Sequence, residues 1–260
     1  MHTGIRVTAS GPVTTVTLNN PDKLNAMSRA MWRELKSAFE AIQRDPAVRC
    51  VLVRGTGLQF CAGGDISEYP GFRFDEAELR HFHEDEVWGA LAAMLACDVP
   101  IVAQIQGACM GAGVEIASAC DLRLASESAQ FGAPIARLGF PMAAREAQLV
   151  TSAVGAMTAR AMLLAAEVFA AAHMAQQGFL THVLPEAELE GACQGLAQRV
   201  AALAPQAARL NKQTLRALQQ GTPLEGSYGY AASAEHQEGI AAFLAKRKPQ
   251  FETGADAQAT

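Results

Sequence analysis

The sequence lacks an excess of positive charge, a long apolar run and any closely spaced pair of cysteines. Its 21 Lys and Arg residues are outnumbered by 26 Asp and Glu residues, and the net charge is −5. This balance excludes the basic surface that nucleic-acid-binding proteins need. We expect no nucleic-acid partner, and any anionic ligand must be met by local positive charges.

Hydrophobic segments are short. Ala90–Leu95 and Ile101–Ile105 are each interrupted within a few residues by charge, Pro or Gln, far below the roughly 20 apolar residues that span a bilayer. Residues 1–5 have neither the basic start nor the apolar stretch of a secretory signal. We therefore expect a cytoplasmic protein without a transmembrane helix or a membrane partner.

The six cysteines are far apart and form no Cys-x-x-Cys pair. The chain has 260 residues, 50% of them hydrophobic, and a protein of this size folds around its core without disulfides. We expect reduced core cysteines and no metal site. Cys61 and Cys109 lie in glycine-rich loops, so a nucleophilic role for one of them stays open as an alternative.

What the chain does have is an alternation of strand-like and helix-like segments. Strands are predicted at 13–18, 48–54, 99–105, 121–125 and 181–184, and helices at 75–96, 112–119, 145–165, 186–203, 205–219, 223–245 and from Ser28 to Asp45. Because the strands gather in the first part of the chain, we predict an α/β fold. Residues 1–200 would form the α/β core and residues 201–260 a helical C-terminal region.

Two glycine-rich loops carry the strongest functional pattern. Phe60–Ile66 and Gly107–Glu115 each follow a strand and place small residues where a backbone can approach a ligand closely. The second loop opens a helix, so its unpaired N–H groups favour a negative charge, as in an oxyanion site. Glu115 lies within reach of that site. One such cluster alone is more typical of a tight turn, and a first-turn Glu often only compensates the helix dipole.

Several motifs together resemble the crotonase superfamily, also called the enoyl-CoA hydratase/isomerase family. The likeness follows the family order from about residue 5 to 251, in Phe60–Ile66, Ile105–Glu115, Ala119–Ala125, Ala129–Gly132 and Phe243–Phe251. The resemblance implies a crotonase-like spiral of ββα units that carries an acyl-CoA site. It also implies a helical C-terminal trimerisation region, and therefore a homotrimer or a hexamer.

The resemblance further implies the roles of individual residues. The amides of Gly64 and Ala112 would hold the thioester oxygen, and Ala112 replaces the usual Gly without loss of the N–H group. Glu115 would be the general acid/base, and coenzyme A, as part of the substrate, would be the only cofactor. The substrate and coenzyme A would contact Lys23, Leu24, Ala26, Ala62, Asp65, Ile66, Pro134, Ile135, Phe243 and Lys246.

One departure from the family pattern concerns the second catalytic glutamate of its hydratases. That residue usually lies in a Gly-x-Pro-Glu string, but Gly132–Ile135 reads Gly-Ala-Pro-Ile here. The run that follows is also altered, to Pro141–Glu146. If Met142 begins a helix, Glu146 or Arg145 would be a replacement, although an exposed first-turn Glu is the default. His81 and His83 are a further source of an acid or base.

The reaction itself stays open at this point. Hydration or dehydration of an enoyl-CoA is the first interpretation, with isomerisation next because one carboxylate suffices to move a proton. Decarboxylase, thioesterase and C–C lyase reactions, and a non-catalytic acyl-CoA-binding protein, are further alternatives. A nicotinamide-dependent oxidoreductase is disfavoured, because Gly107, Gly111 and Gly113 do not fit Gly-x-Gly-x-x-Gly. The acyl group depends on the fold of Phe72–Glu86, which the sequence does not predict.

Overall fold

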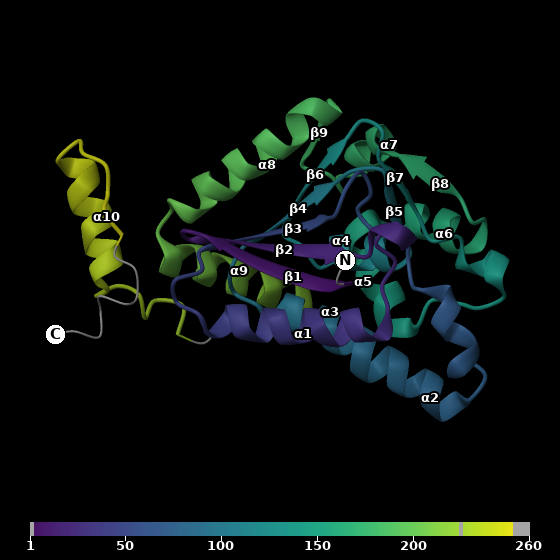
Figure 1. Cartoon of the computed structure of the whole chain (residues 1–260). Helices are drawn as coiled ribbons and strands as arrows, with labels where there is room; N and C mark the ends of the chain where they lie inside the picture. The colour runs from purple at the N-terminus through teal and green to yellow at the C-terminus, as the bar shows by residue number, and fades with distance from the viewer. Residues whose placement is uncertain (1–2, 224–225, 252–260) are drawn as a thin grey trace.

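The computed structural model describes residues 3–223 and 226–251 (Figure 1). Its centre is a six-stranded sheet in the order β1-β2-β3-β4-β6-β9, in which only the β1–β2 pair is antiparallel. These strands are β1 (Gly4–Ser10), β2 (Val13–Asn19), β3 (Cys50–Gly55), β4 (Ile101–Ile105), β6 (Leu122–Ser126) and β9 (His182–Leu184). The predicted α/β class is confirmed, and β1 is a strand that the sequence did not indicate.

The first helix, α1 (Arg29–Arg44), begins where the sequence predicted. The side chain of Ser28 caps it by accepting a hydrogen bond from the Met31 amide at 3.2 Å. Its apolar residues Met31, Leu35 and Phe39 are buried against the sheet, as their helical spacing indicated. Helix α1 therefore covers one face of the sheet, together with α3 (Trp88–Ala96).

Helix α8 (Glu186–Ala201) covers the opposite face (Figure 1). Its buried residues recur at every fourth position, which places them in one row along the helix. They are Leu189, Cys193, Ala197 and Ala201. They pack on strand residues that include Leu52 and Val102, so the sheet is buried on both sides.

A second, three-stranded sheet lies beside the first. It contains β5 (Ala108–Met110), β7 (Gln130–Gly132) and β8 (Val168–Ala170). From β4 to β7 the successive strands alternate between the two sheets. The chain passes from β4 to β5, through helix α4 (Ala112–Ser118) to β6, and then to β7. This winding brings the loops after β3 and β4 together. The three short strands were not predicted, because three residues carry too little periodic pattern.

The predicted long helix over residues 75–96 forms, but its middle is π-helical. The side chain of Asp75 caps α2 (Glu76–His81), the π-helical segment Phe82–Val87 follows, and α3 completes the helix. A π-helical turn holds more residues than an α-helical one. The side chains of α2 are therefore rotated about the helix axis relative to those of α3, compared with a regular α-helix.

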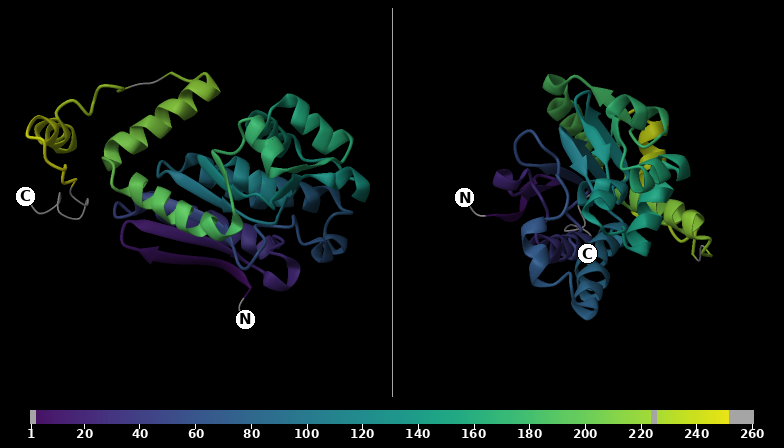
Figure 2. Two further views of the ribbon diagram at one scale, coloured as in Figure 1. Left: turned by 90° about the horizontal axis from the view of Figure 1, so that it is seen from above. Right: turned by 90° about the vertical axis from the view of Figure 1, so that its right-hand side faces the viewer.

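The C-terminal part contains α5 (Ala144–Val154), α6 (Ala156–Leu164), α7 (Ala171–Gln176), α8, α9 (Pro205–Gln220) and α10 (Ala234–Leu244). The helix predicted over 223–245 is wrong at its start, because residues 226–232 form turns and the helix begins at Ala234; residues 224–225 lie outside the described residues. Helix α10 stands away from the body of the chain (Figure 2). In the described part, no helix is both long and apolar enough to cross a membrane.

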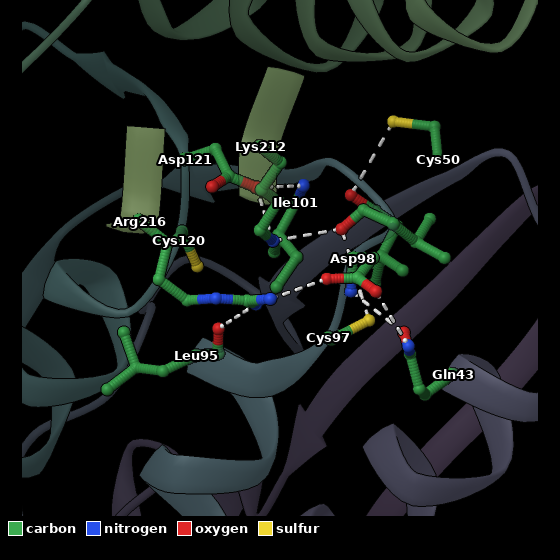
Figure 3. Close-up of polar contacts among 12 residues, drawn as sticks. Gln43, Cys50, Leu95, Cys97, Asp98, Ile101, Cys120, Asp121, Lys212 and Arg216 are labelled. Atoms are coloured by element: carbon green, nitrogen blue, oxygen red, sulfur yellow. Dashed lines mark hydrogen bonds and ion pairs between the residues drawn. The ribbon is translucent and has the colours of Figure 1, made fainter. Parts of the chain in front are cut away.

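Polar contacts hold α9 to the rest of the chain (Figure 3). The carboxylate of Asp98 accepts hydrogen bonds from Arg216 and from Gln213, each at 2.8 Å. Lys212 forms an ion pair with Asp121 at 2.7 Å. Ala217 is the only described residue of α9 that is fully buried, so polar contacts supply much of its attachment.

Candidate active site

A cavity of about 250 Å³ lies where the two glycine-rich loops meet the beginning of α5. Seven of the residues predicted for the site line it: Ala62, Gly64, Ile66, Ala112, Glu115, Pro134 and Ile135. They come from the loop after β3, from α4 and from the short 3-10 turn that follows β7. The winding of the chain between the two sheets thus brings together residues far apart in the sequence.

The first loop is fixed on both sides of Gly64. The amide of Met27 donates to the Gly63 carbonyl at 2.8 Å, and the amide of Asp65 donates to the Met27 carbonyl at 2.8 Å. Among the described residues, the Gly64 amide itself has no backbone acceptor. It lies on the cavity wall with an unused N–H group.

The second loop presents Ala112 in a similar way. Gly111 has a φ of +47°, which glycine tolerates far better than other residues, and its amide donates to the Gly132 carbonyl at 2.9 Å. Ala112 is the first residue of α4, so its amide has no acceptor within the helix. Ala112 also lines the cavity, so two amides without backbone partners border the same space.

Glu115 lies in the first turn of α4 and is 7% exposed. Burial raises the pKa of its carboxyl well above the usual value, and the negative charge of Glu146 raises it further. No hydrogen-bond partner of this carboxyl lies among the residues that the structure describes. Glu115 is therefore a buried acid whose oxygens are free to meet a ligand.

Glu146 also reaches the cavity, from α5. The helix begins at Ala144 and not at Met142, which places Glu146 in its first turn. An exposed Glu146, the default for a first-turn glutamate, is wrong: the residue is 2% exposed. Its Oε1 lies 3.0 Å from Nδ1 of His83, and Nε2 of His83 lies 3.4 Å from a guanidinium nitrogen of Arg73.

Two other candidates for the role of the family's second glutamate, His81 and Arg145, do not reach the cavity. His81 pairs with Asp85 at 2.8 Å on the exposed side of its helix. Arg145 lies 3.3 Å from Glu84 and does not line the cavity. Of the candidates that the sequence left open, Glu146 and His83 are the two that the fold brings to the site.

Aromatic side chains that were not predicted as site residues form a further part of the wall. Tyr69, Phe82 and Phe140 line the cavity together with Arg73. The Arg73 guanidinium lies 3.9 Å from the ring centroid of Phe140 and 4.5 Å from that of Tyr69. Burial raises the pKa of the Tyr69 hydroxyl to about 12, so this group stays protonated. No local pattern distinguishes these residues from ordinary core aromatics.

Several residues predicted to contact coenzyme A lie outside the cavity wall. Lys23 forms an ion pair with Asp65 at 2.7 Å, next to Gly64. Leu24 is exposed and its carbonyl accepts a hydrogen bond from the Ala62 amide at 3.0 Å, whereas Ala26 is buried. Lys23 and Leu24 contact the first loop but, like Ala26, do not line the cavity.

Phe243 and Lys246 are separate from the cavity within one chain. Phe243 is exposed near the end of α10, the helix that stands away from the body in Figure 1. Lys246 follows the same helix. Neither lines the cavity that contains Glu115.

The cysteines do not form a reactive site. Burial raises the pKa of Cys61 to about 12 and that of Cys109 well above its usual value, which leaves little thiolate to act as a nucleophile. All six cysteines are buried and free. Within the described residues, no group of His, Cys, Asp and Glu side chains is arranged to hold a metal ion.

Known proteins share both the sequence and the fold. The family model of enoyl-CoA hydratase/isomerase matches residues 8–254. A probable enoyl-CoA hydratase of Mycobacterium bovis is 31% identical over 243 residues, which cover 91% of this chain and 93% of that protein. The 2,3-dehydroadipyl-CoA hydratase of Escherichia coli is 34% identical over 244 residues, with the same two coverages.

A solved structure gives the same result. The crystal structure of an enoyl-CoA hydratase/carnithine racemase from Magnetospirillum magneticum superposes with a TM-score of 0.92 at 34% identity, covering 97% of this chain and 96% of that one. The resemblance first drawn from the motifs is thereby confirmed. The chain belongs to the enoyl-CoA hydratase/isomerase family, within the crotonase superfamily.

Proposed function

We propose that the chain converts an acyl-CoA thioester through an enolate that its backbone stabilises, with Glu115 as the general acid/base. The observation that carries this proposal is the position of Glu115, which is buried in the same cavity as the two amides without backbone partners. The thioester oxygen would accept hydrogen bonds from Gly64 and Ala112. Coenzyme A enters as part of the substrate, and the proton transfers need no further cofactor.

The physical chemistry of the cavity supports this role. One donor aimed at a developing oxyanion lowers a barrier by about 3 kcal/mol, and a positioned acid or base adds about 10²–10⁴-fold in rate. Burial and the charge of Glu146 raise the pKa of Glu115, which favours its protonated form. Glu115 is therefore suited to give a proton to the α-carbon as the enolate collapses.

The coenzyme A path is part of the same proposal. Lys23, Leu24, Ala26 and Asp65 lie behind the first loop, where the chain would meet the pantetheine and the nucleotide. Lys246 and Phe243 would reach the nucleotide from a neighbouring subunit of a homotrimer or hexamer. Their distance from the cavity within one chain, with α10 set apart from the body, is consistent with that arrangement.

Hydration of a 2-enoyl-CoA is the preferred reaction. The Escherichia coli relative named 2,3-dehydroadipyl-CoA hydratase is 34% identical to this chain, which favours water addition to a 2,3-double bond. Isomerisation is the second candidate. The specific observation in its favour is Ile135, an apolar residue on the cavity wall at the position of the family's second glutamate.

The test is a panel of saturated and 2-enoyl acyl-CoAs incubated with the protein in heavy water. Deuterium entry at the α-carbon reports proton transfer, and loss of the conjugated enoyl absorbance reports hydration. We expect Glu115→Gln to lower both by about 10²–10⁴-fold. Full activity of this variant on every thioester would refute the proposal, and binding of thioesters by the wild type without exchange or turnover would indicate a non-catalytic acyl-CoA-binding protein.

A further inference from the structure

Three described side chains form a line of hydrogen bonds that ends in the cavity. The guanidinium of Arg73 lies 3.4 Å from Nε2 of His83, and Nδ1 of His83 lies 3.0 Å from Oε1 of Glu146. His83 and Glu146 are both on the cavity wall with Glu115. The three residues come from three separate parts of the chain, so the line forms only in the folded protein.

The partners of His83 assign its proton. An arginine has donors only, so the Arg73 N–H donates and Nε2 of His83 must accept. The proton of the neutral imidazole is then on Nδ1, from which it is donated to Glu146. Glu146 therefore accepts this hydrogen bond through Oε1, and the positive charge of Arg73 lies at the far end of the line.

The two glutamates differ in their surroundings. Glu115 has no hydrogen-bond partner among the described residues, and burial raises its pKa, which favours its neutral form. Glu146 has a partner, because its Oε1 accepts a hydrogen bond from Nδ1 of His83 at 3.0 Å. Two carboxyl groups with different surroundings in one cavity are suited to act as an acid and a base.

We propose that Glu146 is a second catalytic residue of this chain, the base that activates water, and that His83 and Arg73 are its positioning residues. This inference rests on the proposed function. Glu146 would supply, from α5, the second acid/base group that Ile135 cannot supply in the same cavity. A second such group favours hydration over isomerisation, because water addition needs a base for the water.

Glu146 takes a proton from water as the water oxygen forms a bond to the β-carbon of the enoyl thioester. The electrons of the double bond move into the enolate, whose oxygen the Gly64 and Ala112 amides hold. The α-carbon then takes the proton of Glu115, and solvent returns the proton from Glu146 to Glu115. The net change is the addition of one water molecule.

The experiment compares Glu146→Gln with a matched control, Glu84→Gln, which removes an exposed charge from the neighbouring π-helical segment. Short, medium and long 2-enoyl-CoAs report hydration, and saturated acyl-CoAs in heavy water report α-carbon exchange. We expect Glu146→Gln to lower hydration about 10²–10⁴-fold while exchange falls by less than about tenfold. Glu84→Gln should change neither, and melting temperatures check that both variants fold.

His83 is tested as a positioning residue with two substitutions. An Asn side chain carries its N–H near the place of Nδ1, so His83→Asn should keep hydration within about tenfold of the wild type. His83→Leu leaves the buried Glu146 oxygen without its donor and should cost about 10–100-fold in kcat. The recovery of hydration in His83→Asn is the readout that a purely structural role of His83 would not give.

Each result decides between the two proposals. Hydration by Glu146→Gln within about threefold of the wild type would overturn this inference. A wild type that exchanges the α-hydrogen but hydrates none of the enoyl thioesters would also overturn it and would leave the proposed function intact. If the wild type catalyses neither α-hydrogen exchange nor hydration, both the proposed function and the proposed role of Glu146 are refuted.

Discussion

Gly64 and Tyr69 are so close that a Cβ atom on Gly64 would lie 2.1 Å from the Tyr69 hydroxyl oxygen. We expect Gly64→Ala to displace the Tyr69 ring, which packs edge-on against Phe72, Phe82 and Phe140. Because the displaced ring shares the cavity with the Gly64 amide, kcat/KM should fall by about tenfold or more. Steady-state kinetics across the thioester panel check this expectation.

Gly191→Ala is the matched control for this substitution. Gly191 lies on the exposed side of α8, with no atom within 4 Å of the new Cβ. The free energy of unfolding should rise by about 0.5–1 kcal/mol, because alanine is the better helix former, and activity should not change. Equal loss of activity in both glycine variants would show that the contact with Tyr69 has no special role.

The second prediction concerns the pH dependence of stability. The pKa of Glu115 is raised by burial and by the charge of Glu146, so the folded state holds a proton that the unfolded chain releases above its lower pKa. Stability therefore decreases as pH rises from the unfolded pKa of about 4.3 towards the folded one. Glu115→Gln cannot ionise, so its gain in melting temperature over the wild type should be larger at pH 7 than at pH 4. An equal gain in melting temperature at pH 4 and pH 7 would mean that Glu115 ionises in the folded protein as readily as in the unfolded chain.

The third prediction concerns the attachment of α9. Burial alone would raise the pKa of Asp98, but hydrogen bonds from Gln213, Gln43 and Arg216 hold it below the usual value. A lowered pKa stabilises the fold above the unfolded pKa of about 3.9, and this contribution is lost as pH falls through the folded value. Asp98→Asn should cost about 1–3 kcal/mol at neutral pH, measured by urea unfolding.

The control for Asp98 is Glu40→Gln, on the exposed side of α1. It removes one negative charge without touching α9, and its effect should stay within about 0.5 kcal/mol. Hydrogen exchange locates the loss, since the amides of α9 should exchange faster in Asp98→Asn than in Glu40→Gln. Unchanged exchange along α9 would refute the assignment of Asp98 as its anchor.

The fourth prediction concerns assembly. Leu215 and Leu218 on α9 are each 68% exposed, and Phe243 and Leu244 on α10 are also exposed. Large apolar residues exposed on two successive helices are candidates for burial in a protein interface. We predict three or six copies by light scattering, and a shift to smaller species in Leu215→Asp combined with Leu218→Asp. Gln198→Asp on α8 should leave the mass unchanged, and a wild-type monomer at micromolar concentration would contradict the prediction.

Local chemistry explains what the sequence could predict. Ser28 caps α1 because its side chain is followed directly by a helical apolar pattern, and that information lies within a few residues. Glu115 was a candidate because a glycine-rich loop and a helix start surround it in the sequence. The family motifs extended this to the order of the elements along most of the chain.

The remainder of the site depends on contacts between distant segments. Glu146 had the pattern of an ordinary first-turn glutamate, and only the packing of α5 near His83 buries it. Tyr69 and Arg73 follow the first loop in a stretch without regular periodicity. A single residue inserted into a helix leaves no local signal either, so the π-helical segment 82–87 was not predicted.

That π-helical segment has an evolutionary consequence. Loss of one codon within it would restore ordinary α-helical winding and turn His83 by roughly 100°, the angle between successive residues of such a helix. The imidazole would then leave Glu146, and the same scaffold would hold this carboxyl group without its donor. If Glu146 acts as proposed, such a deletion would weaken water addition and leave Glu115 and the amides of Gly64 and Ala112 in place.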